Sequence, residues 1–171
     1  MKTIKCPFNM LVEFSQLPDH ARFWIFTSNR FLTQKEIASL NNELSLFVQK
    51  WTAHKQDLNA SFSLMDDAIL VVGVDESQTG ASGCSIDSMT KEIVRLSQQM
   101  NIDWLNRFSV VVKSSEGNRT VNANDLKQLF SEGKINEQTL VSNSLLSAFG
   151  EVKTHLYLPI KDTWMSRYLK A

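Results

Sequence analysis

The chain has 171 residues, of which 43% are hydrophobic and 21% are charged, and its 18 basic residues balance 18 acidic ones. This length and composition predict one globular domain, or one core with an added part, that needs no disulfide or metal for stability. With zero net charge and no basic stripe, the chain lacks the signature of a nucleic-acid-binding protein, so we expect no nucleic-acid partner. Zero net charge also removes one barrier to self-association, and both a monomer and a homodimer are compatible with it.

Membrane insertion, secretion and metal binding also lack their usual signatures in the sequence. The longest apolar run, residues 68–74, is too short to cross a bilayer, and the first residues (MKTIKCPFNMLVEF) lack the uninterrupted apolar stretch of a signal peptide. Two cysteines, Cys6 and Cys84, and three scattered histidines make neither a disulfide scaffold nor a zinc site. We therefore expect a cytoplasmic protein with no membrane partner, no metal and no cofactor.

The first predicted elements are a strand and a helix. Residues 22–28 (RFWIFTS) are rich in aromatic and β-branched residues and apolar on both faces, which predicts a central strand. Thr33 and Glu36 then form the T-x-x-E pattern of a capping box, and apolar residues follow at helical spacing. We expect this helix to end at about Lys50.

Two further strands and a second helix follow. Residues 60–65 alternate between apolar and polar side chains, and residues 68–74 read as a buried strand, with a tight turn expected at Asp66 and Asp67. Residues 86–100 carry apolar side chains at three- and four-residue steps, which predicts the second helix.

A strand at residues 108–113 completes the order β-α-β-β-α-β, which is the ferredoxin-like arrangement. We therefore predict an α+β protein in which residues 1–113 form an N-terminal arm and a ferredoxin-like core. The expected strand order is 4-1-3-2, with both helices on one face. Residues 114–171 are expected to form a C-terminal α/β extension packed on this core.

Within the extension, residues 116–118 resemble a hairpin turn, and Asn122 is placed to cap a short helix that ends at Gly133. Residues 152–158 alternate in polarity, which predicts a strand. We expect Asp162 to cap a final turn or helix.

The predicted topology gathers polar residues from distant parts of the sequence. The start of strand one, the end of strand three, the loop after helix one and the start of helix two all lie at the same end of a ferredoxin-like sheet. The residues expected there are His20, Trp51, His54, Asp75, Glu76, Cys84 and Asp87.

Cys84 is the candidate reactive residue of this group. It lies in GASGCSIDS, and if Ser85 is the N-cap of helix two, Cys84 immediately precedes the first turn. The unpaired N–H groups and the dipole at a helix start favour the thiolate, which is the reactive form. We expect Cys84 to react faster than Cys6. The alternative is that Cys84 is a small buried residue of the core.

A thiol nucleophile needs a base and a group that orients the base. The predicted catalytic set is therefore Cys84, with His54 or His20 as the base and Asp75 as the orienting carboxylate. Glu76 and Asp87 are the alternatives to Asp75.

The loop before helix two also predicts an anion site. Glycines free its backbone, and a helix start follows a strand. The predicted ligand-binding residues are Glu76, Gly80, Ser82, Gly83, Ser85 and Asp87. The Gly-Lys-Ser/Thr ending of a phosphate loop is missing, because Cys84 and Ser85 follow Gly83, and we expect no ATP binding or hydrolysis through this loop.

These observations leave two functions open. The first is a small-ligand or anion-binding protein, or an enzyme, that uses the Cys84 loop. The second is a protein-interaction or assembly module without catalysis. The expected partner is accordingly an unidentified small molecule or protein.

Five segments spread over essentially the whole chain carry a resemblance to a known family. They are LPDHARFWIF (17–26), WTAH (51–54), VDESQTGASGCSIDS (74–88), GKINEQTLVSN (133–143) and LPIKDTWMSRYL (158–169). Together they resemble a family of small bacterial proteins often labelled "ABC transporter ATPase". That label conflicts with the residues, because the chain has no Walker lysine and no transporter-ATPase signature. The resemblance implies a cytosolic bacterial protein, points to residues 75–88, and implies no mechanism.

A second, partial resemblance lies between residues 108 and 143. Its succession of hairpin, helix, G-K-I and T-L-V is similar to GYF-type adaptor modules, which bind proline-rich peptides. The segment lacks the Gly-Pro-Phe-like signature and the aromatic cradle of those modules. It keeps a peptide-binding or assembly role open.

Overall fold

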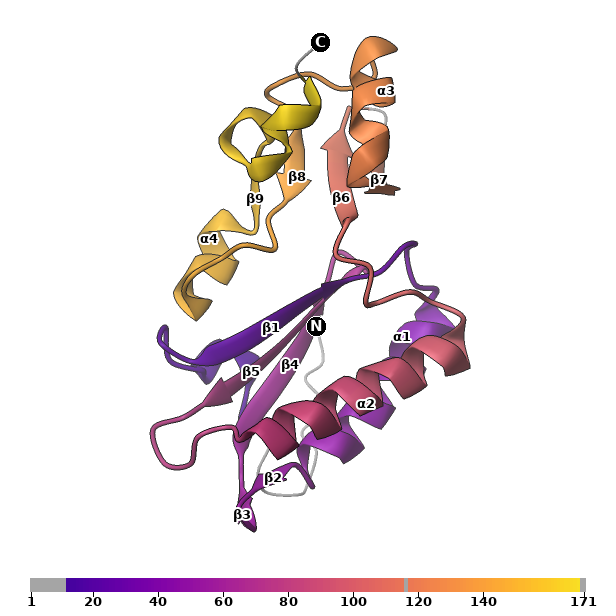
Figure 1. Cartoon of the computed structure of the whole chain (residues 1–171). Coiled ribbons are helices and arrows are strands. Elements are labelled where there is room, and N and C mark those ends of the chain that lie inside the picture. Colours follow the sequence, from indigo (N-terminus) through magenta and orange to yellow (C-terminus); the bar gives the residue numbers. More distant parts are fainter. Residues whose placement is uncertain (1–11, 116, 170–171) are drawn as a thin grey trace.

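The computed structural model describes residues 12–115 and 117–169 of the chain. Helices and antiparallel sheets alternate in it, so the α+β class is confirmed. One sheet with two long helices makes the lower part of the view in Figure 1, and a second sheet with short helices makes the upper part.

The first sheet has three strands in the order β1-β5-β4, and all neighbours are antiparallel. Its strands are β1 (Arg22–Thr27), β4 (Asn59–Met65) and β5 (Ile69–Asp75). Helices α1 (Gln34–Val48) and α2 (Gly83–Met100) lie together on one face of this sheet (Figure 1), as predicted. The capping box of Thr33 and Glu36 is present at the start of α1.

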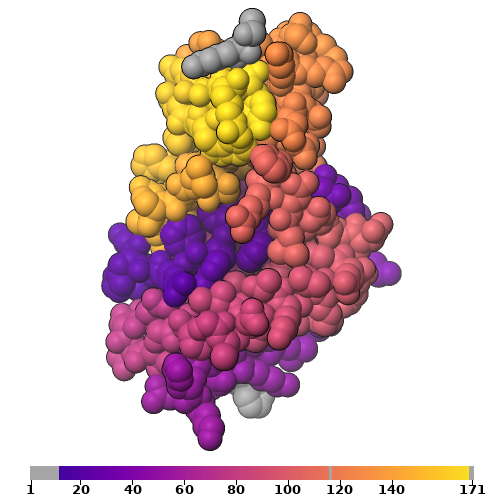
Figure 2. Space-filling view, in the orientation of Figure 1, coloured from indigo at the N-terminus to yellow at the C-terminus, as the bar shows by residue number. Residues whose placement is uncertain are grey.

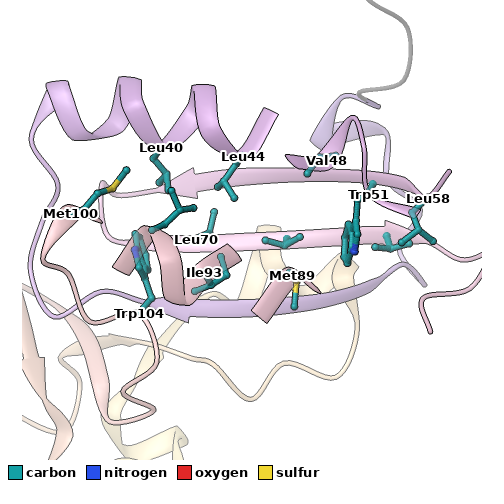
Figure 3. Close-up of a cluster of buried hydrophobic side chains, with 14 of the residues drawn as sticks. Leu40, Leu44, Val48, Trp51, Leu58, Leu70, Met89, Ile93, Met100 and Trp104 are labelled. Atoms are coloured by element: carbon teal, nitrogen blue, oxygen red, sulfur yellow. The ribbon is translucent and has the colours of Figure 1, made fainter. Parts of the chain in front are cut away.

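The helices and the sheet enclose the main core, cluster one, which Figure 3 shows between them. The apolar steps of the sequence explain why each helix buries one stripe. From α1 and α2 the buried residues are Leu40, Leu44, Val48, Met89, Ile93, Leu96 and Met100. Trp51 and Trp104 close the two ends of the cluster (Figure 3).

Two tight turns shape the end and the middle of this half. The hairpin of β2 (Thr52–Ala53) and β3 (Gln56–Asp57) turns through two residues with positive φ. The predicted turn between β4 and β5 is confirmed, because Asp66 and Asp67 have φ of 48° and 53° and the Ala68 N–H donates to the Met65 carbonyl.

The second sheet has the order β7-β6-β8-β9, again antiparallel. Its strands are β6 (Ser109–Ser114), β7 (Gly117–Asn122), β8 (Leu140–Ser142) and β9 (Tyr157–Pro159). This half has its own apolar cluster around Val112, Leu126, Val141 and Ile160, which are fully buried.

Short helices complete the C-terminal half. They are α3 (Leu126–Ser131) and α4 (Val152–His155). Single turns of 3-10 helix lie at Phe14–Gln16, Ala123–Asp125, Phe149–Glu151 and Ile160–Asp162, and a longer one at Trp164–Leu169.

The face of the first sheet opposite α1 and α2 is covered by the C-terminal half. A second cluster, cluster two, joins residues of both halves, among them Ile69 and Val71 of β5 with Phe149 and Val152. Strand β5 is therefore buried on both faces. The two sheets share one continuous interior.

The predicted ferredoxin-like sheet is not formed by the described residues, and this is a correction. The order 1-3-2 of the first three predicted strands agrees with β1-β5-β4, but the fourth predicted strand, β6, lies in the other sheet. Strand β7 occupies one edge of β6 and β8 the other, so neither edge is left to pair with β1.

Strand β1 is therefore an edge strand of the described sheet, whereas the sequence predicted a central strand. The prediction rested on apolar side chains on both faces. Both faces are indeed covered, because Trp24 and Phe26 pack on cluster one while Phe23 and Ile25 pack on cluster two. Covered faces and paired edges are separate properties of a strand.

The extension confirms some of its predicted details and corrects others. Asn122 caps the turn before α3 by accepting a hydrogen bond from the Asn124 N–H, and Gly133 has a φ of 70° just after α3. The strand predicted at residues 152–158 is wrong: its first half is the helix α4, and only its end belongs to β9.

The cap predicted at Asp162 is also wrong. Thr163 caps the final turn instead, because its hydroxyl accepts from the Met165 N–H at 3.2 Å. Of the hairpin turn predicted at residues 116–118, Gly117 and Asn118 belong to β7, and residue 116 lies outside the described residues.

The division of the chain after residue 113 stays a prediction. In the structure, the second hydrogen-bonded sheet already begins with β6, at Ser109. Among the helices of the described residues, none combines the length and apolar character that crossing a membrane requires.

Candidate functional site

The predicted polar segments do meet at one end of the first sheet. The register pairs Arg22 with Val74 and Asn59 with Asp75, so β1 and β4 begin where β5 ends. The hairpin β2-β3 and the start of α2 lie at this same end (Figure 1).

Helix α2 begins one turn earlier than predicted. Its N-cap is Ser82, whose hydroxyl accepts a hydrogen bond from the Ser85 N–H at 3.2 Å. Ser85 is buried, and its own hydroxyl donates to the Ser82 carbonyl at 2.8 Å. The N-cap prediction for Ser85 is therefore wrong, because Ser82 has the extended backbone that a cap requires.

Cys84 consequently lies within the first turn of α2 rather than before it. Its side chain is exposed and makes no disulfide. The alternative that Cys84 is a buried core residue is wrong. Cys6, its predicted comparison, lies outside the described residues.

An open pocket of about 590 Å³ lies beside this first turn. It is formed by the end of α1, the hairpin β2-β3 and the start of α2. The lining residues are Glu43, Leu46, Phe47, Lys50, Trp51, Thr52, His54, Ser82, Cys84, Ser85, Ser88 and Glu92. Cys84 and His54, from the predicted catalytic set, therefore line the same pocket.

Trp51 joins two of the segments that form the pocket. Its ring is 2% exposed, and its Nε1–H donates to the Ser85 carbonyl at 2.8 Å. This buried hydrogen bond ties the chain after α1 to the first turn of α2. His54 follows three residues later at the tip of the hairpin and lines the same pocket as Cys84.

Some charged residues around the pocket are paired with a residue of opposite charge. Glu43 and Glu92 both accept hydrogen bonds from Arg95, at 2.7 Å and 2.6 Å. These bonds raise the pKa of Arg95, with Glu92 the larger cause and Glu43 the next. The two carboxylates are thus largely compensated, and Lys50 brings positive charge to the lining of the pocket.

His20 and Asp75 form a separate group. The Asp75 carboxylate accepts from the Ser77 hydroxyl at 2.5 Å and the Ser77 N–H at 3.0 Å, and the Ser77 hydroxyl lies 3.5 Å from Nε2 of His20. The two hydrogen bonds from Ser77, followed by one from Asn59 and by the charge of His20, lower the pKa of Asp75. His20 lines a different groove, described below, and neither residue lines the Cys84 pocket.

Two of the six predicted ligand-binding residues, Ser82 and Ser85, line the pocket. Glu76 instead shapes the preceding loop, because it accepts from the Ala81 N–H at 2.8 Å and lies 3.6 Å from Arg22. Gly80 and Gly83 are exposed, and Asp87 is exposed with Lys91 at 3.8 Å.

The sequence reasoning missed the wall that α1 contributes. Leu46 is 47% exposed although it is large and apolar. A signal was available, because Leu46 falls outside the buried stripe of Leu40, Leu44 and Val48. An exposed apolar residue outside the buried stripe of an amphipathic helix indicates a surface that binds a ligand or a partner.

No cluster of metal-ligating side chains occurs in residues 12–115 and 117–169. Comparison with known proteins gives no match to a family model, to a curated protein or to a solved structure. The two resemblances seen in the sequence therefore stay predictions.

Proposed function

We propose that the protein binds a small organic anion with an apolar part in the Cys84 pocket. The observation that carries the proposal is the exposed Cys84 on the first turn of α2, in one open pocket with His54 and Lys50. The pocket volume of about 590 Å³ lies within the range usual for small-molecule sites.

The anionic end of such a ligand is matched by the start of α2. The first N–H groups of a helix have no partner within the helix. In α2 the Ser85 N–H is taken by the Ser82 hydroxyl and the Ile86 N–H by the Ser82 carbonyl, which leaves those of Gly83 and Cys84 for a ligand. A helix start attracts an exposed anion by about 0.3–1 kcal/mol, and Lys50 adds to this attraction.

The apolar end is matched by the end of α1. Phe47 and Trp51 have ring centroids 5.3 Å apart, and Leu46 beside them is half-exposed. A ligand that covers Leu46 removes apolar surface from water, which stabilises the complex. An inorganic anion alone cannot make this contact.

The exposed thiol extends the proposal to catalysis. A thiol at a helix start is in the position where cysteine nucleophiles are activated. We propose that Cys84 adds to a carbonyl carbon of the bound anion: the S–C bond forms as the C=O π bond opens, His54 accepts the thiol proton, and His54 returns it to the carbonyl oxygen to give a hemithioacetal. His20 and Asp75 are not part of this proposed step, because they lie in the separate group.

Two alkylating reagents test the anion site without knowledge of the natural ligand. Iodoacetate is an anion and iodoacetamide is neutral, and both modify thiols. We expect the ratio of their rates at Cys84 to be about fivefold higher in the folded protein than in the protein unfolded in urea, which corresponds to about 1 kcal/mol of attraction. Mass spectrometry of the Cys84 peptide measures both rates, and the Cys6 peptide is followed in the same digest.

Variants then separate the pocket from the rest of the surface. Lys50→Ala should lower the ratio toward its unfolded value, whereas Lys127→Ala on α3 should leave it unchanged. Phenyl phosphate should protect Cys84 at lower concentration than inorganic phosphate does. Equal ratios in the folded and unfolded protein, or labelling of Cys84 only after unfolding, would show the proposal to be wrong.

A further inference from the structure

A long groove runs along the outer edge of β1 and is distinct from the Cys84 pocket. Its volume is about 1060 Å³. Residues 20–27 form its floor, residues 104–107 with Met89 and Thr90 of α2 form one wall, and residues 108–109 and 144–147 with Trp164 form the other. In Figure 2 the indigo band of β1 is visible between α2 and the C-terminal half.

The floor of the groove presents main-chain groups that no strand of the described residues pairs with. The Ser28 N–H donates to the Ala68 carbonyl at 2.9 Å, and this pair continues the β1-β5 register. In an antiparallel ladder only alternate residues direct both main-chain groups toward the partner strand. Arg22, Trp24 and Phe26 therefore face β5. The residues that direct their N–H and C=O groups into the groove are Phe23, Ile25 and Thr27.

No described strand pairs with this edge, because β1 is the last strand of its sheet and β6 pairs elsewhere. The groove is the place beside β1 that a fourth strand of the sheet would fill. Six residues of β1 offer about 20 Å of edge, enough to pair with a segment of similar length. Open edges of this kind bind extended peptides by strand addition.

The walls of the groove are apolar where side chains of an added strand would point. Successive side chains of a strand point to opposite faces, and here each face has an apolar wall. Three large apolar residues of these walls are exposed: Leu105 by 44%, Phe108 by 42% and Leu145 by 70%. An added strand with apolar side chains at successive positions would cover all three.

The charges of the groove have one sign. The charged lining residues are Arg22 and Arg107, and the lining contains no aspartate, glutamate or lysine. Arg22 is 3.6 Å from Glu76 and lies over the Trp24 ring, whereas Arg107 is exposed. This charge is complementary to a segment that carries carboxylates.

A second copy of the chain fits the groove poorly. Its own β1 would be recessed between the same two walls, so two such edges cannot meet. It would also bring the same arginines toward each other. A single extended segment enters the groove without either conflict.

We propose that the outer edge of β1 docks an extended, acidic and apolar segment of a partner protein, which adds to the sheet as its fourth strand. Main-chain bonds to Phe23, Ile25 and Thr27 supply the pairing. Leu105, Phe108 and Leu145 contact its side chains, and Arg107 contacts a carboxylate.

The test begins with a library of random seven-residue peptides displayed on phage and selected on the full chain. The retained peptides should carry Asp or Glu beside runs of apolar residues and should contain no proline in the run. A synthetic copy of the strongest peptide should lose binding when alternate amide nitrogens are methylated, because its side chains are kept but its donors are lost. Failure to retain any such peptide, or equal binding of the methylated copy, would overturn the proposal.

Amide hydrogen exchange supplies the decisive pattern. In the free protein the amides of Phe23, Ile25 and Thr27 should exchange faster than those of Trp24 and Phe26, and the peptide should slow only the first set. Protection of that set in the free protein overturns the proposal in favour of another occupant. Protection that grows with protein concentration identifies a second copy, and protection that disappears in a chain starting at Val12 identifies residues 1–11.

Variants of the groove confirm the site. Ile25→Pro removes an outward N–H without removing a hydrogen bond to β5. It should lower the affinity for the peptide by about tenfold or more, whereas Ile25→Val should leave the affinity unchanged. Should Ile25→Pro fail to fold, the exposed variants Leu145→Asp and Arg107→Glu are expected to weaken binding by about tenfold as well, with Lys127→Glu unchanged. Unaltered affinity in both exposed variants would overturn the proposed contacts.

Discussion

His54 and Lys55 show how individual residues are held at the rim of the Cys84 pocket. Their φ values are 52° and 67°, in the left-handed region that favours glycine and asparagine at a hairpin turn. The hairpin keeps this shape because Trp51, Ala53 and Leu58 on its flanks are buried. The packing of neighbours thus offsets a local backbone cost and places His54 in the pocket.

A glycine in place of Lys55, the second residue of the β2-β3 turn, should lower the free-energy cost of the positive φ. We expect Lys55→Gly to raise the free energy of unfolding by up to about 1 kcal/mol, because glycine has no Cβ to clash at positive φ. The matched control is Lys153→Gly in helix α4, which should lower stability by up to about 1 kcal/mol. Urea unfolding followed by circular dichroism measures both, and a loss of stability in Lys55→Gly would contradict the argument.

At the scale of elements, one ion pair joins the start of α1 to the end of α2. Arg30 donates to both carboxylate oxygens of Glu36, at 3.0 Å and 2.7 Å, and also to the Met100 carbonyl at 3.0 Å. Glu36 accepts in addition from the Thr33 N–H at 2.8 Å. The hydrogen bonds from Arg30, followed by those from Thr33, lower the pKa of Glu36 to about 2.

This pKa predicts a pH dependence of stability. The folded pKa lies below the ordinary value of 4.5, so the contribution of Glu36 is present above that pH and is lost as the pH falls toward 2. We expect Glu36→Gln to lower the free energy of unfolding at neutral pH by about 1 kcal/mol, since the pair is partly exposed. The deficit should shrink as urea unfolding is repeated at lower pH. A constant deficit at every pH, or the same pH-dependent deficit in the exposed control Glu137→Gln, would contradict this assignment.

At the scale of the whole molecule, the two halves are joined by packing and by polar contacts, among them those of Asp66. Asp66, in the turn of the first sheet, accepts from the Tyr157 hydroxyl and lies 3.1 Å from Lys113 of the second sheet. Burial alone would raise the pKa of Asp66, but the bonds from Tyr157 and Lys113 outweigh it and the pKa is lowered. Cluster two also packs residues of both halves together, so we expect the halves to unfold in one transition.

Gly73 tests this shared interior. A Cβ at this position would lie 2.6 Å from Cδ1 of Leu17 and 3.4 Å from Cε2 of Phe149, so Gly73→Ala should cost about 1–3 kcal/mol through overpacking. The control is Gly83→Ala, where no atom lies within 4 Å of the added Cβ and stability should be unchanged or higher. Tryptophan fluorescence and the methyl signals of Val112 should report the same lowered midpoint for Gly73→Ala. Separate midpoints would show that the halves unfold independently.

Much of the candidate site was predictable because it depends on the order of the elements. The sequence placed Cys84 at a helix start and His54 at the same end of the sheet, and the pocket contains both. It could not separate His20 and Asp75 from them, because the loop that binds Asp75 to Ser77 is a local fold without a periodic pattern. It also missed the wall around Leu46, since an exposed apolar residue gains its meaning only from the neighbours it faces.

The sequence by itself determined the two long helices, the three strands of the first sheet and the turn at Asp66 and Asp67, because caps, apolar periodicity and turn residues act over a few neighbouring residues. It also indicated that both faces of β1 and β5 would be covered. Only the tertiary structure decided which edges pair. Edge pairing depends on main-chain groups that every residue carries, so the side-chain pattern of β1 does not show whether a strand lies beside it. In this structure β6 pairs with β7 and β8 in the second sheet, and a groove lies along β1.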